Sequence, residues 1–94
     1  MTYQFKINKD VAVEDIARFV GCGIHVAEML FGAPRVRAES SYMFDDKARV
    51  VIINGDSTVG SHLVQILSYR LTEEFGEESF EVKQFADEEA AYEY

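Results

Sequence analysis

The sequence predicts an α+β fold: a two-layer β-α-β-β-α-β sandwich in which a four-stranded antiparallel sheet carries two helices on one face. Two observations lead to this prediction. Short segments with alternating or β-branched apolar residues are typical of strands, and two longer segments have apolar residues at helical spacing. A chain of 94 residues is long enough for one domain with a modest core.

The first strand and the first helix are expected before Pro34, which prevents a helix from continuing. Residues 3–7 alternate, and the apolar side of this strand is formed by Tyr3, Phe5 and Ile7. Apolar residues then recur at helical spacing over residues 13–31. Gly21 and Gly23 lie inside this segment, and each costs about 1 kcal/mol relative to alanine. We therefore expect either one bent helix or two short ones.

A hairpin is expected in the middle of the chain. Residues 35–44 alternate between apolar and polar side chains, and residues 49–54 form a β-branched run. The short polar connection at residues 45–47 is typical of a hairpin turn. If the alternation holds, Val36 and Val50 face the helices, and Arg35, Arg49 and Val51 face away from them.

A second helix and a last strand are expected to complete the sheet. The apolar stripe of the helix runs from Val59 to Phe75, and Gly76 is its stop signal. Residues 79–85 form the last strand, with Phe80 and Val82 facing inward. The sequence thus predicts a single α+β domain over residues 1–85. Residues 86–94 are acidic and are expected to be either frayed or a short helix.

Charge and cysteine content limit the partners and the location. The chain has 17 acidic and 9 basic residues and a net charge of −8, which argues against binding to nucleic acid or anionic lipid. No apolar run approaches the roughly 18–20 residues that span a bilayer, and no cofactor motif is complete. The single cysteine, Cys22, predicts a reducing compartment, and we expect the cytoplasm.

The sheet face that the helices leave uncovered, here called the open face, is the predicted docking surface. Basic and apolar side chains gather there, a mixture typical of interfaces. The predicted contact residues are Arg35, Arg37, Arg49, Val51, Ile53, Lys83 and Phe85. The alternative is a solvated face whose charges discourage edge pairing. The leading hypothesis is a non-enzymatic binding or regulatory domain that docks a protein partner or self-associates, with a homodimer as one form.

Three other patterns bear on chemistry. Cys22, His25 and His62, with Glu28 nearby, are weak metal candidates because they lack paired ligand spacing, and no base is fixed beside Cys22 for nucleophilic work. The glycines of the segment 55–62 resemble a phosphate loop but lack its lysine, so a helix cap is favoured. No complete catalytic constellation is present, which favours a protein that is not an enzyme.

Several short segments resemble the HPr-like phosphocarrier family. They are Asn54-Gly55-Asp56-Ser57, the helix Leu63–Leu71, the opening Phe5–Lys9 and the stretch Ala17–Val20. The resemblance implies a β-α-β-β-α-β core and a phosphoryl carrier with a phosphorylated histidine. The nearest string is Gly23-Ile24-His25, which lacks the family's arginine and proline, so His25 is only a weak candidate. A small-molecule-binding regulatory domain is a further alternative, based on fold analogy.

Overall fold

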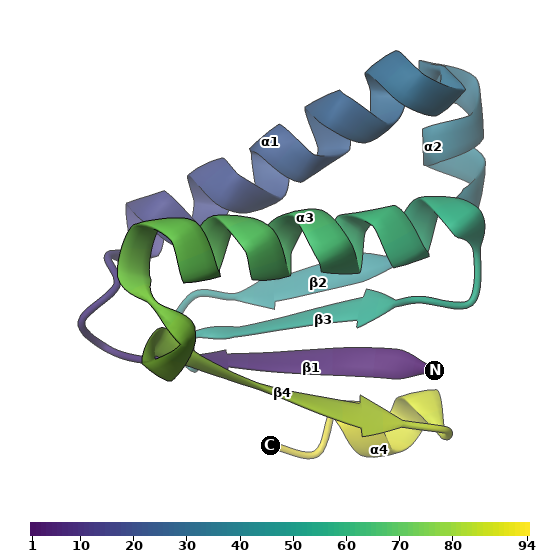
Figure 1. Ribbon diagram of the computed structural model, residues 1–94. Coiled ribbons are helices and arrows are strands. Elements are labelled where there is room, and N and C mark those ends of the chain that lie inside the picture. The colour runs from purple at the N-terminus through teal and green to yellow at the C-terminus, as the bar shows by residue number, and fades with distance from the viewer.

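A computed structural model describes residues 1–94 and has the predicted α+β class, with helices stacked on one face of a four-stranded sheet (Figure 1). In chain order the elements are β1 (Thr2–Ile7), α1 (Val13–Phe31), α2 (Ala33–Glu39), β2 (Tyr42–Asp45), β3 (Val50–Asn54), α3 (Thr58–Phe75), the 3-10 helix η1 (Glu77–Ser79), β4 (Phe80–Phe85) and α4 (Glu88–Ala91). The sheet order is β2-β3-β1-β4, and every neighbouring pair is antiparallel. This order is the ferredoxin-like, or split β-α-β, arrangement.

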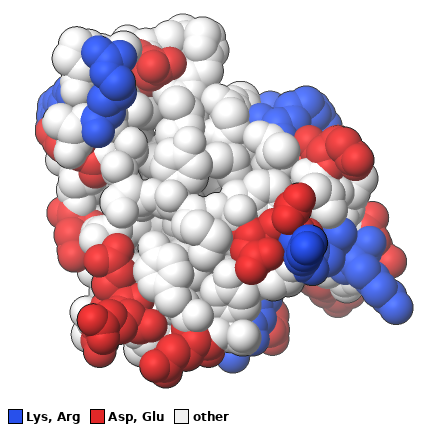
Figure 2. Space-filling model, turned by 180° about the vertical axis from the view of Figure 1, so that it is seen from behind, with Lys and Arg blue, Asp and Glu red and all other residues white.

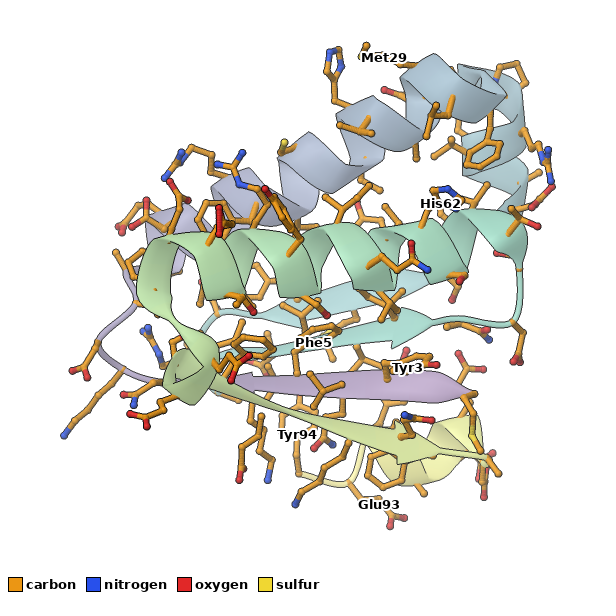
Figure 3. All side chains as sticks on the ribbon, in the orientation of Figure 1. Tyr3, Phe5, Met29, His62, Glu93 and Tyr94 are labelled. Carbon is orange, nitrogen blue, oxygen red and sulfur yellow. The ribbon has the colours of Figure 1, made fainter.

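The core lies between the sheet and the helices α1 and α3. Phe5 on β1 is opposite Val51 on β3 and Val82 on β4, so these side chains share the helix face of the sheet. Phe5 is fully buried and its ring stacks on that of Phe80 at a centroid distance of 6.1 Å. Figure 3 shows Tyr3 and Phe5 on the side of β1 that faces the helices, as their alternation predicted.

The two long helices follow the predicted spacing. α1 is one helix that continues through both glycines, and at Gly23 it lies against α3, since a Cβ there would stand 3.5 Å from Leu63 and Ile66. α3 begins after Ser57, whose hydroxyl accepts from the backbone N–H of Gly60 at 2.9 Å, and it ends before Gly76 at φ 87°. No single helix is both long and apolar enough to cross a membrane; only α1 and α2 together, across a bend of 120°, have that length and composition.

The prediction that residues 35–44 form one strand was wrong. Residues 33–39 form the helix α2, and only Tyr42–Asp45 form the strand β2. Pro34 ends α1 but also suits the first turn of a new helix, where its missing N–H has no partner to lose. Arg35 pairs with Glu39 one turn away at 2.6 Å, and Val36 alone of this helix is buried. The apparent alternation was therefore a short amphipathic helix.

The predicted side-chain direction of β3 was also wrong. Val51 and Ile53 are 0% and 3% exposed and belong to the core under the helices, whereas Val50 and Ile52 point to the open face. Arg49 has φ 59° and belongs to the turn, so alternation could not be extended through it. The residues 50–53 are all apolar, and pairing with β1 decides which of them face the helices.

The C-terminal segment lies across the open face. Its one helical turn, α4, places Ala91 against Val50 and Ile52, and Ala91 is completely buried. The buried side chain of Gln4 donates from Nε2 to the Ala91 carbonyl oxygen at 2.7 Å. The Tyr94 hydroxyl donates to Asp45 Oδ2 at 2.7 Å, and Figure 3 shows Tyr94 on the side of the sheet opposite the helices. Part of the predicted docking face is thus occupied by the chain itself.

Candidate functional site

The predicted docking residues do not form one surface. Arg35 and Arg37 lie on α2, where the Arg35 guanidinium stacks over Phe31 at 4.9 Å. Arg49 sits in the turn before β3 and donates to the carbonyl oxygen of Asn8 at 2.9 Å. Lys83 and Phe85 do face the open side of β4, and Phe85 packs on the small cluster around Ala91. With Val51 and Ile53 buried in the core, only Lys83 and Phe85 are on the predicted face.

The cysteine and the histidines do not come together. No group of three or more His, Cys, Asp or Glu side chains is placed to hold a metal ion. His62 packs edge-on against Phe31 at 5.0 Å, and its Nδ1 donates to the Thr58 carbonyl oxygen at 3.1 Å. Figure 3 shows it on the side of α3 that faces α1 and α2. His25 is exposed in the middle of α1, away from the free N–H groups at the helix start, and its carrier role stays a prediction.

The glycines of the loop before α3 are explained by packing. A Cβ on Gly60 would lie 2.0 Å from the Asn54 carbonyl oxygen, so no other residue fits there without a shift. Two N–H groups of the loop are engaged within the chain: that of Gly55 donates to the Met1 carbonyl oxygen and that of Asp56 to the Asn54 side chain, both at 2.9 Å. The Ser57 hydroxyl accepts from the Gly60 N–H, so the predicted helix cap is confirmed.

Hollows on the surface are shallow or very small. Two open depressions of about 380 and 280 Å³ share Asn8, Glu78 and Ser79 at the end of the sheet where β1 meets η1. A narrow apolar crevice lies between α1, α3 and the sheet and is lined by Phe19, Val20, Gly23, Tyr42, Ile53, Leu63 and Leu67. Its volume of about 10 Å³ is room for no more than one water molecule.

The edge strand β2 carries the most distinct feature of the surface. Its neighbour β3 donates from the Asn54 N–H to the Ser41 carbonyl oxygen at 2.9 Å, so Ser41 and Asn54 form a hydrogen-bonded pair. Along an antiparallel ladder, hydrogen-bonded pairs alternate with pairs that exchange no hydrogen bonds. Met43 therefore bonds toward Ile52 of β3, and the N–H and C=O groups of Tyr42 and Phe44 point away from the sheet.

The opposite edge, β4, has the same backbone pattern but different side chains. The Asn8 N–H donates to the Ser79 carbonyl oxygen at 2.8 Å, so by the same alternation the backbone groups of Phe80, Val82 and Gln84 point outward. Between them stand Glu81 and Lys83, both exposed. Charged side chains of this kind protect an edge strand from pairing, and β2 has none before Asp45.

Beyond the turn that carries Asp46 and Lys47, much of the surface on this side of the molecule is uncharged (Figure 2). Figure 2 shows the molecule from behind, the side of α1, α2 and β2, with charged side chains around the rim and other residues filling the centre. Tyr42 is 45% exposed, and Phe44 is half-buried, as are Val20 and Ile24 on α1. An uncharged, partly apolar area beside free backbone groups is suited to a protein partner.

The single charge on β2 is already satisfied inside the chain. The Tyr94 hydroxyl and then the backbone N–H of Ala48 donate to the Asp45 carboxylate, and they lower the pKa of Asp45 below its ordinary value. The same contact raises the pKa of Tyr94. The Asp45 side chain points to the open face, like Val50 opposite it, and its carboxylate is bonded there to Tyr94.

Sequence reasoning missed this edge because it extended the strand back to Arg35. Residues 40–44 carry no charge, but longer uncharged runs such as 29–34 and 50–55 occur in the same chain, so this feature alone did not single out the edge. Comparisons with protein-family models, with curated proteins and with solved structures find no match for this chain.

Proposed function

We propose that this chain is a small, non-enzymatic binding domain that takes up an extended segment of a protein partner along the edge of β2. The observation that supports it is that the backbone N–H and C=O groups of Tyr42 and Phe44 point outward from a strand that has no charged residue before Asp45. A cytoplasmic location, based on the single Cys22, is part of the same proposal.

Strand addition explains what each group at the edge would do. Tyr42 and Phe44 each supply one N–H donor and one C=O acceptor, so a partner strand would make up to four backbone hydrogen bonds. Side chains would supply the selectivity. Tyr42 and Phe44 lie on the helix face and Met43 on the open face, so apolar side chains of the partner would find a neighbour on either side.

The edge is a better docking place than the open face predicted from the sequence. On that face α4 already covers Val50 and Ile52, and Gln4 is bonded to the Ala91 carbonyl oxygen. A partner would first have to displace this segment. At the β2 edge nothing in the chain has to move.

The test uses proline substitutions at the two edges. Tyr42→Pro removes an N–H that points outward from β2 and leaves the ladder to β3 intact. Gln84→Pro does the same at the outer edge of β4 and is the matched control. Wild-type protein and both variants are immobilised and exposed to a cell extract that contains an added untagged copy of the chain, after circular dichroism has shown that each is folded.

The expected result is a protein held by wild type and by Gln84→Pro but not by Tyr42→Pro. Retention of the same proteins by all three would contradict binding at β2. So would the failure of all three to retain any protein, the added copy included.

A further inference from the structure

We infer that the partner strand is β2 of a second copy, paired antiparallel with Met43 opposite Met43 across a two-fold axis. This inference rests on the proposed function and names its partner. The result would be a continuous sheet of eight strands, twice the four of one chain, with the helices of both copies on the same side.

The backbone allows this register and favours it over its neighbours. Two residues directly opposite each other on neighbouring strands point their side chains to the same side of the sheet. In a symmetric pairing of two identical strands, the two-fold axis must therefore pass between two copies of the same residue. A centre at Met43 sets Tyr42 of each copy opposite Phe44 of the other. Both residues point their N–H and C=O groups outward, so all the outward groups of β2 find partners. A centre at Phe44 would place Tyr42 opposite Asp46, and a centre at Tyr42 would place Phe44 opposite Ser40; Asp46 and Ser40 both lie outside the strand.

Side chains and charges are compatible with the same register. Tyr42 of each copy would pair with Phe44 of the other copy on the helix face, which gives two aromatic pairs related by the two-fold axis. Such cross-strand pairs stabilise sheets. Asp45 would lie opposite Ser41 and not opposite a second carboxylate. This matters because the chain has a net charge of −8, and like charges placed directly across strands oppose pairing.

Disulfide trapping tests the register. Cys22 is the only cysteine, so Cys22→Ser gives a background without thiols. In that background Met43→Cys would place two thiols in a non-hydrogen-bonded pair, with Cα atoms about 4.5 Å apart, inside the range that a disulfide spans. Tyr42→Cys is the control, because the strand rise and spacing put its two Cα atoms about 8 Å apart, which is beyond that range.

Sedimentation equilibrium tests the assembly without new cysteines. Wild type and Gln84→Pro should reach twice the single-chain mass of 10.7 kDa as concentration rises, while Tyr42→Pro stays at one chain. Mild oxidation should convert the Met43→Cys protein, and not the Tyr42→Cys protein, to a reducible dimer. If Tyr42→Pro fails to fold, the cysteine pair decides the matter on its own.

Two outcomes would overturn the inference. One is a single-chain mass for wild type at concentrations up to about 1 mM, the weak end of specific association. The other is cross-linking that is as fast through Tyr42→Cys as through Met43→Cys. If wild type is a monomer but captures a protein that the Tyr42→Pro variant does not capture, the inference is wrong and the proposed function stands. If wild type is a monomer and captures no protein, both are wrong.

Discussion

The two faces of the sheet are covered in different ways. On the helix face, α1 and α3 bury a continuous core that reaches from Phe5 on the sheet to Leu71 on α3. On the open face, the last nine residues, 86–94, cover Val50 and Ile52 with one helical turn and one buried alanine, Ala91. The first cover is made of long amphipathic helices, and the second is made of a short, acidic chain end.

The difference indicates which face holds the fold together. Burial of a large apolar side chain contributes about 1.5–3 kcal/mol, and the helix face has many such side chains whereas the open face has few. A helix of four residues has no stability of its own in water, so α4 depends on its contacts with the sheet. We expect the helix face to determine global unfolding and the C-terminal segment to be released at lower free energy.

The largest effect is expected on the helix face. Phe5→Ala should lower the free energy of unfolding by about 3–5 kcal/mol, because it leaves a cavity where a fully buried ring stacks on Phe80. Urea unfolding followed by far-UV circular dichroism measures the change. Met29→Ala on α1 is the control, since Met29 is 73% exposed and its loss should change little. Equal effects of the two substitutions would contradict this view of the core.

The next largest effect is expected from the chain end. Ala91→Glu would place a carboxylate against Val50 and Ile52, so the segment should leave the sheet and lower the free energy of unfolding by about 1–3 kcal/mol. The loss is limited to what the segment contributes, because the rest of the fold stays in place. The released segment should also become sensitive to protease. Ala86→Glu, at an exposed position, is the control. Unchanged protease resistance in the Ala91 variant would count against a cover that opens separately.

A smaller effect is expected from the one buried polar contact between sheet and chain end. Gln4→Ala removes the donor to the Ala91 carbonyl oxygen and should lower the free energy of unfolding by about 1 kcal/mol. Its readout is hydrogen exchange at the amides of α4, which should become faster while those of α3 do not. Faster exchange in both helices would mean that Gln4 supports the whole fold.

The helix face could be predicted from the sequence, and the reasons are local. The alternation in residues 3–7 and the stripe from Val59 to Phe75 each place apolar side chains on the helix face, and this was confirmed. That β1 has only one buried side was wrong, because Gln4 on the other side is buried under the C-terminal segment. β3 could not be assigned in the same way, because Val50, Val51, Ile52 and Ile53 are buried on both faces and carry no alternation. Only its register against β1 decides which of them face the helices.

The β2 edge and the open face could not be predicted for a related reason. The alternation of Val36 and Ala38 favours a strand, but the turn that Pro34 makes starts a helix, in which Val36 is buried and Ala38 is exposed. The last residues read as solvated because of their acids. Their apolar members, Ala91 among them, find a place only once the sheet has formed. Long-range pairing, which the local sequence does not encode, thus decides the place of the chain end.

The smallest effect is expected at the end of the cover, where Tyr94 meets Asp45. Because the bond lowers the pKa of Asp45, its contribution to stability is present above the ordinary carboxyl pKa of about 4 and is lost as the pH falls through the folded value. The raised pKa of Tyr94 adds a contribution that is present below about pH 10 and is lost as the pH rises through the folded value. Tyr94→Phe should therefore lower the urea midpoint slightly between these limits, and by less as the pH falls further below about 4, whereas Tyr92→Phe, which removes an exposed hydroxyl, should not lower it. A difference between wild type and Tyr94→Phe that does not shrink at all as the pH is lowered would show that the ring, and not its bond to Asp45, fastens the chain end.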